Sequence, residues 1–273
     1  MKFSFASLFT KLTLATSVAG ALVGCDEPNY PEPKPVTEST VGRASVLVVN
    51  AAPGATGTVV TLDNSPFGSA LPYLGASATT QVNAGQRLFT FNEPTNIPSN
   101  YAPGTARTVT SRSAFNGNAG YTIFLTDQTN RAIPANQTAD QGGIRTLSLP
   151  TTIATPAANN ARIRFVNLSP SGTYGIYNSI TQAPLFSGAP TRAYRTTNNG
   201  TTATSVNYAN FTEVAATTYT LDVRSSTATA VPIVESQGTF TFAAGKSYTL
   251  YVRGVANSTN SATALGISVV QHN

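Results

Sequence analysis

The carboxylates are the first groups to consider for chemistry, because paired Asp or Glu side chains carry out reactions such as glycoside hydrolysis. From residue 44 onward they are few: Asp63, Glu93, Asp127, Asp140, Glu213, Asp222 and Glu235. None belongs to a recognisable catalytic motif. The alternation of Thr217–Arg224 also puts Asp222 on the outward face of a strand. We therefore do not expect a hydrolase that uses two carboxylates.

The sequence also has few residues for histidine-based catalysis or metal binding. The single His, His272, is next to last and predicted to fray, so a Ser-His-Asp triad is not expected. The sequence has one Cys, which excludes a Cys/His zinc site, and no clustered Asp-x-Asp-x-Asp pattern for calcium. We predict no catalytic residue, no metal site and no cofactor, and thus no enzyme.

The only Cys indicates a different chemistry. Cys25 follows Leu22, Val23 and Gly24 at the end of the apolar run Leu12–Val23, which comes after a lysine-containing start. These are the parts of a secretory signal peptide, and the run is too short for a membrane-spanning helix. The four residues resemble the bacterial lipobox, whose Cys becomes the acylated N-terminus and carries fatty acids such as palmitate. An ordinary signal peptide with an incidental Cys is the alternative.

A lipidated Cys25 predicts a membrane-anchored, exported protein. Each buried CH₂ contributes about 0.8 kcal/mol, so two or three acyl chains give durable attachment. Asp26-Glu27 resemble both an inner-membrane retention signal and the surface-export signal of Bacteroidetes-type lipoproteins. Glu27–Thr40 is rich in Pro and predicts an extended tether. We expect residues 1–24 to be removed and residues 25–43 to form the lipidated Cys and tether.

The rest of the chain contains a sequence motif that occurs twice. Ala44–Pro53 and Ala161–Pro170 both alternate as strands and both end in Val-Asn-x-x-Pro. The landmarks Asn50, Pro53, Asn167 and Pro170 recur at domain-length spacing, which indicates one module written twice. In the second copy, the alternation predicts Ile163 and Phe165 in a core, with Arg162 and Arg164 in water.

The modules are predicted at residues 44–150 and 161–271, with a Pro-containing linker at 151–160 that offers little shared core. Strands recur every 8–12 residues, Thr is abundant and charged residues make up only 10%. This pattern predicts an all-β protein of two tandem immunoglobulin-like antiparallel β-sandwich domains. The scattered basic residues, at a net charge of +5, do not indicate a nucleic-acid partner.

These landmarks are also where the chain resembles a family. The two Val-Asn-x-x-Pro phrases, together with Gly245, Tyr248 and the strand after them, are similar to domain of unknown function 4397. The family normally has a His where this chain has Asn50 and Asn167. The resemblance implies secreted or lipid-anchored β-sandwiches, often in tandem, and favours the outer membrane, where the protein could be surface-exposed. It implies no activity and no catalytic residues.

Two functional hypotheses follow. The first is a non-enzymatic structural or adhesion protein of the cell envelope that presents loops to a protein or glycan partner. The alternative is an accessory carbohydrate-binding lipoprotein. Its sugar-stacking surface would combine several tyrosines, namely Tyr177, Tyr194, Tyr208 and Tyr251. Asn50 and Asn167 could line a ligand site, but an Asn before a tight turn more often caps its own backbone.

Overall fold

A computed structural model describes residues 41–55, 57–93, 107–132, 142–202, 205–225 and 233–273. Val41–Asn273 form one compact unit, and the regular structure described in it consists of β-strands. Among these residues there is no helix of the length and apolar character needed to cross a membrane. The predicted signal peptide, the lipobox and residues 25–40 of the predicted tether lie outside the described residues. Arg43, predicted as the end of the tether, instead begins the first strand.

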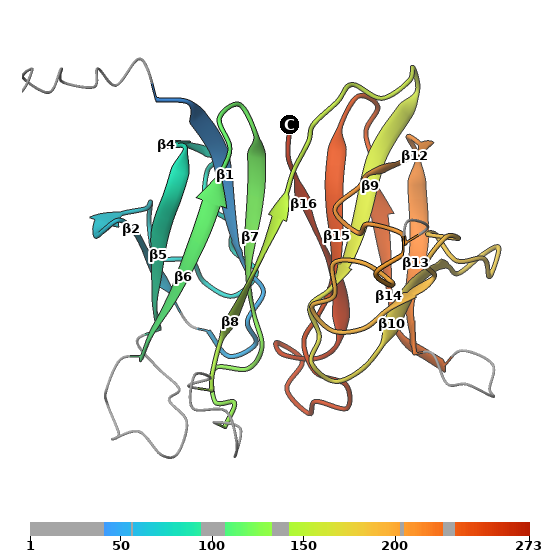
Figure 1. The fold of residues 1–273 in the computed structure, drawn as a ribbon. Helices are drawn as coiled ribbons and strands as arrows, with labels where there is room; N and C mark the ends of the chain where they lie inside the picture. The colour runs from blue at the N-terminus through green and yellow to red at the C-terminus, as the bar shows by residue number, and fades with distance from the viewer. Residues whose placement is uncertain (1–40, 56, 94–106, 133–141, 203–204, 226–232) are drawn as a thin grey trace, which may run out of the picture. The chain divides into compact units, whose positions relative to one another are not determined.

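The first half of this unit forms a β-sandwich, which we call the first sandwich. Its two sheets have the strand orders β4-β1-β7-β8 and β3-β2-β5-β6 (Figure 1). The strands are β1 (Arg43–Asn50), β2 (Val59–Leu62), β3 (Ser65–Pro66), β4 (Thr80–Asn83), β5 (Gly85–Glu93), β6 (Arg107–Phe115), β7 (Gly120–Thr126) and β8 (Arg145–Pro150).

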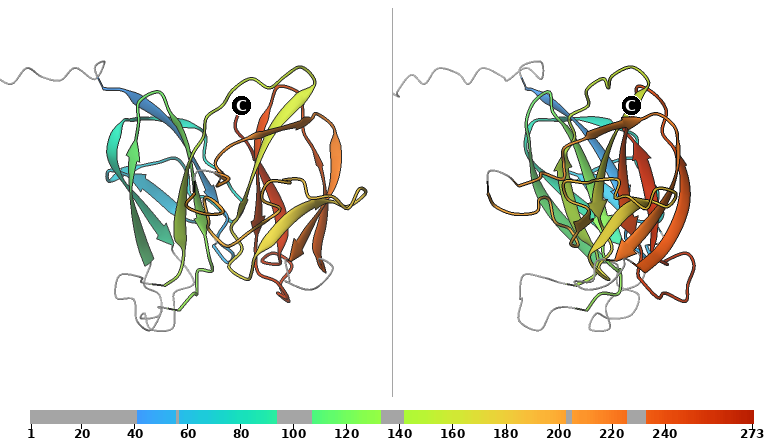
Figure 2. Two further views of the ribbon diagram at one scale, coloured as in Figure 1. Left: turned by 45° about the vertical axis from the view of Figure 1, so that its right-hand side comes forward. Right: turned by 90° about the vertical axis from the view of Figure 1, so that its right-hand side faces the viewer.

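The second half forms the second sandwich, from sheets of order β12-β9-β15-β16 and β11-β10-β13-β14, and its two layers are visible in the turned views of Figure 2. The strands are β9 (Asn160–Asn167), β10 (Tyr174–Asn178), β11 (Thr191–Arg192), β12 (Thr212–Ala215), β13 (Thr218–Ser225), β14 (Ile233–Thr241), β15 (Ser247–Arg253) and β16 (Gly266–Gln271).

The two sandwiches share one topology. Each strand of the first has a counterpart eight numbers later in the second, and both sheets keep their order under that shift. The predicted all-β fold of two sandwiches is therefore confirmed. The sheets are antiparallel except where β1 pairs with β7, with Val48 opposite Ile123, and where β9 pairs with β15, with Phe165 opposite Leu250. These two parallel pairs were not predicted from the sequence.

Alternating side chains fill a core inside each sandwich. In the first sandwich, Val46 and Val48 of β1 pack with Phe89 and Phe91 of β5. In the second, Ile163 and Phe165 of β9 occupy the corresponding core, as predicted. Because a strand places alternate residues on opposite faces, the residues between them point out of the sandwich.

Those outward residues form a third core, which the two sandwiches share. The first sandwich contributes Leu47, Val49, Ala51, Phe124, Leu147 and Leu149, and the second contributes Val166, Leu168, Ala209, Tyr251 and Val270. The rings of Phe124 and Tyr251, from the corresponding strands β7 and β15, lie 5.6 Å apart. The expectation of little shared core between the modules is wrong, because β1, β7, β9 and β15 are buried on both faces.

The outer face of strand β13 is also partly buried. Leu221 and Val223 are fully buried, as predicted. Asp222 and Arg224, predicted to face water, are also buried and form an ion pair of 2.6 Å between Arg224 Nη2 and Asp222 Oδ2. The Tyr177 ring lies 5.0 Å from the Arg224 guanidinium carbon and Gln182 accepts a hydrogen bond from Arg224, so these two residues help cover the pair.

The difference between the two faces of β13 gives a test of the fold. Leu221→Ala should lower the free energy of unfolding by about 2–5 kcal/mol, because it removes buried methyl groups and leaves a cavity. Thr220→Ala, one residue away on the opposite face and half-exposed, should cost less than about 1 kcal/mol. Urea unfolding of both variants measures the contrast. A larger loss for Thr220→Ala would mean that the strand is in the wrong register.

Candidate functional site

Arg164 is the largest fully buried side chain of the described residues, although the alternation of its strand predicted that it faces water. It lies on the outward face of β9, where the first sandwich covers it. The equivalent residue of the first repeat is Leu47, which belongs to the shared core. A charged residue on an alternating strand was reasonably predicted to face solvent. That prediction fails here because the solvent side of β9 is an internal surface.

All five N–H groups of Arg164 are satisfied by neutral oxygens. Nε donates to Thr249 Oγ1 at 2.7 Å, and Nη1 donates to the carbonyls of Pro150 and Ala209. Nη2 donates to Thr122 Oγ1 at 3.2 Å and Thr151 Oγ1 at 2.8 Å. Burial lowers the pKa of Arg164 to about 9. Since no donor is left over, this guanidinium joins the two sandwiches and has no capacity for a ligand.

His272 lies beside this cluster and is not frayed, contrary to the sequence prediction. Its Nε2 is 2.7 Å from Thr249 Oγ1, and its ring meets the Phe211 ring edge to face. The first sandwich repeats the arrangement with Thr122 and Thr151, whose hydroxyls are 2.8 Å apart. Burial, and secondarily the positive charge of Arg164, lower the pKa of His272 to about 3. The ring is therefore neutral at physiological pH.

The depressed pKa of His272 predicts acid destabilisation. The unfolded chain binds a proton as the pH falls through about 6.5, whereas the folded chain does so only near 3. Stability is therefore lost as the pH falls below about 6.5. We expect the free energy of unfolding to drop by about 1–2 kcal/mol between pH 7 and pH 5. Urea melts at both pH values measure the drop, and His272→Gln should abolish it. An unchanged drop in that variant would assign it to other groups.

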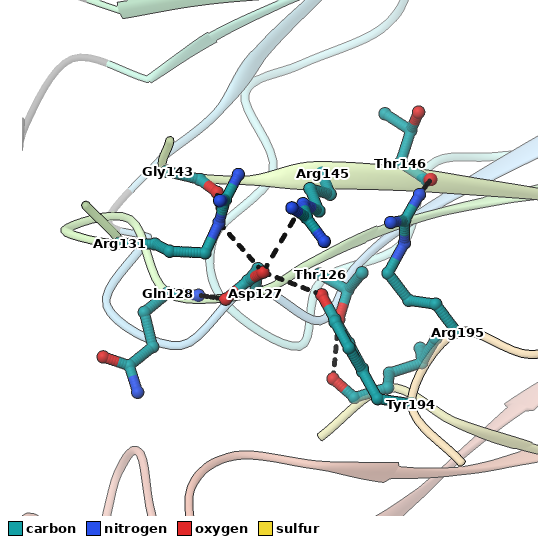
Figure 3. A network of polar contacts seen from close by, with 10 residues as sticks. Thr126, Asp127, Gln128, Arg131, Gly143, Arg145, Thr146, Tyr194 and Arg195 are labelled. Atoms are coloured by element: carbon teal, nitrogen blue, oxygen red, sulfur yellow. Dashed lines mark hydrogen bonds and ion pairs between the residues drawn. The ribbon is translucent and has the colours of Figure 1, made fainter. Parts of the chain in front are cut away.

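A second polar cluster surrounds Asp127, directly after β7 (Figure 3). Its carboxylate is buried and accepts a hydrogen bond from the backbone N–H of Gln128 at 2.9 Å. Arg131 Nε lies 3.0 Å and Arg145 Nε 3.9 Å from Asp127 Oδ2. Asp127 has a left-handed φ of 72°, and its counterpart after β15 is Gly254, with a φ of 83°. The first repeat thus places a carboxylate where the second has only a turn.

The second sandwich reaches this cluster across the shared core. Tyr194 donates its hydroxyl hydrogen bond to Asp127 Oδ2 at 3.0 Å, and Arg195 Nη2 donates to the carbonyl of Thr146 at 2.6 Å. Burial, with a further contribution from the Asp127 charge, raises the pKa of Tyr194, so its hydroxyl keeps its proton. Thr126 Oγ1 also donates to the carbonyl of Leu168 at 2.6 Å. These bonds hold the loop ends of the two sandwiches together.

The repeat landmarks shape those loop ends. Asn50 Oδ1 accepts a hydrogen bond from Ala52 N at 3.1 Å, and Asn167 Oδ1 accepts one from Ser169 N at 3.0 Å. Both amide groups also donate: Asn50 to the carbonyl of Leu71, and Asn167 to those of Gly172 and Arg192. Both residues are buried. They show the backbone-capping geometry expected from the sequence and offer nothing to a ligand.

The other landmarks are structural as well. Gly245 has a φ of 80°, which favours glycine, and turns the chain into β15. The Tyr248 hydroxyl accepts a hydrogen bond from Ala243 N at 3.1 Å, and Tyr121 accepts the corresponding bond from Asn116 N at 3.0 Å. Pro53 is one of the residues that line a surface pocket at the loop end, and Pro170 lines an adjoining one.

These two pockets form a groove between the loops of the two sandwiches. One has a volume of about 470 Å³ and the other about 340 Å³, and Gln128 and Val255 line both. The first sandwich contributes the turn at Pro53 and the segment after β7, and the second contributes the turn at Pro170, Tyr194 and the loop after β15. Hydroxyl and amide side chains dominate the lining, and the Asp127 cluster lies along one side. This is the groove we consider the candidate site.

The four tyrosines proposed as a sugar-stacking surface are not together. Tyr177 packs against Arg224, Tyr208 lies over Arg192 with 4.0 Å from ring centre to guanidinium carbon, and Tyr251 is in the shared core. Tyr194 alone lines the groove. The sequence does not predict where these tyrosines lie relative to one another, because the residues next to each tyrosine do not show what its ring contacts in the fold.

The buried carboxylates lie on different elements of the fold. Glu93 ends β5 and accepts a hydrogen bond from Thr58 Oγ1 at 2.6 Å, whereas Asp222 pairs with Arg224 in the second sandwich. Asp127 belongs to the cluster at the groove. In the part of the chain that the structure describes, no three His, Cys, Asp or Glu side chains gather as metal ligands. Cys25 and the rest of the lipobox lie outside it.

Comparisons with known proteins bear on the first sandwich. No curated protein matches the chain. A family model described as Domain of unknown function (DUF4397) matches residues 44–173. The match begins in β1, covers the first sandwich and continues through β9 into the turn at Pro170. The similarity to this family thus covers the first sandwich and the first strand of the second.

Proposed function

We propose that this protein is a non-enzymatic binding or adhesion module of a bacterial cell envelope, exported and anchored by lipid on Cys25. The second sandwich is then a second domain of the same family, since it repeats the strand order and the Asn cap of the first. The outer membrane is the proposed location on the strength of the family resemblance, because Asp26-Glu27 resemble an inner-membrane retention signal as much as the surface-export signal of Bacteroidetes-type lipoproteins. The Pro-rich segment would hold the double sandwich away from the membrane surface.

The convergence of equivalent loops on one groove supports a binding role. The Val-Asn-x-x-Pro turns and the segments after β7 and β15 come from both repeats and meet there. Binding residues are commonly carried on loops that a rigid scaffold positions. The shared core and the Arg164 and Asp127 clusters provide such a scaffold, because they fix the loops of one sandwich relative to those of the other.

The anchor is tested by Cys25→Ser. We expect this variant to lack acyl groups and to leave the membrane fraction in large part, because two or three acyl chains supply the attachment. Mass spectrometry of the wild-type N-terminus gives the direct measurement. An unmodified N-terminus in the wild-type protein would contradict the proposed anchor, whatever the sedimentation of the variant.

The binding role is tested by photo-crosslinking in intact cells. A benzophenone side chain is placed at Asn130, which is exposed in the groove, and in a control protein at Asn116, which is exposed in the turn before β7. We expect a discrete adduct from position 130 that position 116 does not form. If neither position yields an adduct to protein or polysaccharide, the groove is not a binding surface.

An accessory carbohydrate-binding lipoprotein is the second candidate. The four tyrosines do not form one sugar-stacking surface, so they do not support this function. The hydroxyl and amide side chains that line the groove support it instead. The two pockets, of about 470 and 340 Å³, also fall in the size range of small-ligand sites.

A further inference from the structure

Three side-chain amides in the groove are unpaired within the part of the chain that the structure describes. Gln128, Asn130 and Asn257 line the larger pocket, and their side chains form no hydrogen bond to any residue that the structure describes. Figure 3 shows the Gln128 amide directed away from the Asp127 carboxylate, although its backbone N–H binds there. By contrast, the buried amides of Asn50 and Asn167 are fully engaged. The groove therefore concentrates unused donors and acceptors.

The charges near the groove are already paired with each other. The Asp127 carboxylate accepts from Gln128 N and Tyr194 and pairs with Arg131, and Arg131 also donates to the carbonyl of Gly143. Replacing these contacts by ligand charges would first require breaking buried ion pairs. A neutral ligand that forms many hydrogen bonds fits this lining better than an anion or a cation.

The shape of the groove distinguishes between neutral ligands. Extended peptides are usually recognised by adding a strand to an open sheet edge, and helices by an apolar groove. The groove is bordered by loops and turns, not by a strand edge, and most of its lining is hydroxyl or amide. The hydroxyls of a sugar can pair with these groups. The half-buried ring of Tyr194, whose hydroxyl is committed to Asp127, offers an apolar surface of the kind that sugar rings contact.

We propose that the groove binds a neutral glycan, with Gln128, Asn130 and Asn257 as its hydrogen-bonding residues and Tyr194 as its stacking surface. This inference rests on the proposed binding role and narrows it to one class of ligand. Specificity in such a site comes from placed hydrogen-bonding groups, because each unpaired buried polar group weakens binding.

The inference is tested by titrating the full-length protein with neutral hexasaccharides of glucose, mannose and xylose and with an oligogalacturonate, using calorimetry. The test variant combines Gln128→Ala with Asn257→Gly, since glycine accepts the φ of 58° at residue 257. The control is Asn116→Ala, which removes an exposed amide at the turn before β7. Circular dichroism melts confirm that both variants fold.

We expect at least one neutral oligosaccharide to bind and the double variant to bind it about tenfold more weakly, because about two hydrogen bonds are lost. Asn116→Ala should bind as the wild type does. Binding of the oligogalacturonate alone, or equal binding by the double variant, would overturn the inference. If no sugar binds while position 130 crosslinks to a protein in cells, the glycan inference fails and the binding role stands.

Discussion

Arg164→Ala should lower the free energy of unfolding by about 3 kcal/mol or more, one of the two largest effects we expect. The substitution leaves a cavity and removes the donor for the Thr122, Thr151 and Thr249 hydroxyls and for two backbone carbonyls. Arg164→Met, which fills much of the space without a charge to desolvate, should cost less. Urea unfolding of the full-length protein measures both changes.

Arg162→Ala is the matched control. Arg162 lies on the same face of β9 but is half-exposed. Its Nη1 donates a 3.4 Å hydrogen bond to the carbonyl of Ala154, and its guanidinium carbon lies 5.5 Å from the centre of the Phe211 ring. It should cost less than about 1 kcal/mol. Equal losses for Arg162→Ala and Arg164→Ala would show that the buried guanidinium contributes nothing particular to the contact between the sandwiches.

Separating the sandwiches should have an effect at least as large. Residues 161–273 expressed alone would expose Val166, Tyr251 and Val270, now buried in the shared core. Burial of three such side chains is worth on the order of 5 kcal/mol. The sequence predicted two modules with little shared core, so that this half would fold by itself. The shared core leads us to expect a fragment that is much less stable than the whole chain, or that self-associates through the exposed face.

The fragment is examined by analytical ultracentrifugation and urea unfolding beside the full-length protein. Tyr251→Thr combined with Val270→Thr should reduce self-association of the fragment, while the same changes should destabilise the full-length protein. A monomeric fragment that unfolds at the same urea concentration as the full chain would show that the shared core adds no stability. Folding of each half would then be independent, as the linker composition first indicated.

The sequence alone determined the fold class and the internal repeat. Alternation of Ile163 and Phe165, or of Leu221 and Val223, identified the core face of each strand correctly, because strand geometry fixes which residues share a face. The Val-Asn-x-x-Pro phrases located two turns whose Asn caps are local contacts, formed with the backbone two residues along the chain. Local geometry of this kind needs no knowledge of the rest of the protein.

Only the tertiary structure decided what the opposite faces contact. Arg164 and Asp222 were expected in water, and His272 in a frayed end. Packing from other elements instead buries Arg164 and Asp222 and holds His272 half-buried. The pattern of a strand says that two faces differ, but it does not say whether solvent or a second domain covers the polar one. The groove at Gln128 and Asn257 depends on the same packing. Its lining residues come from loops that are far apart in the sequence and meet only where the two sandwiches join.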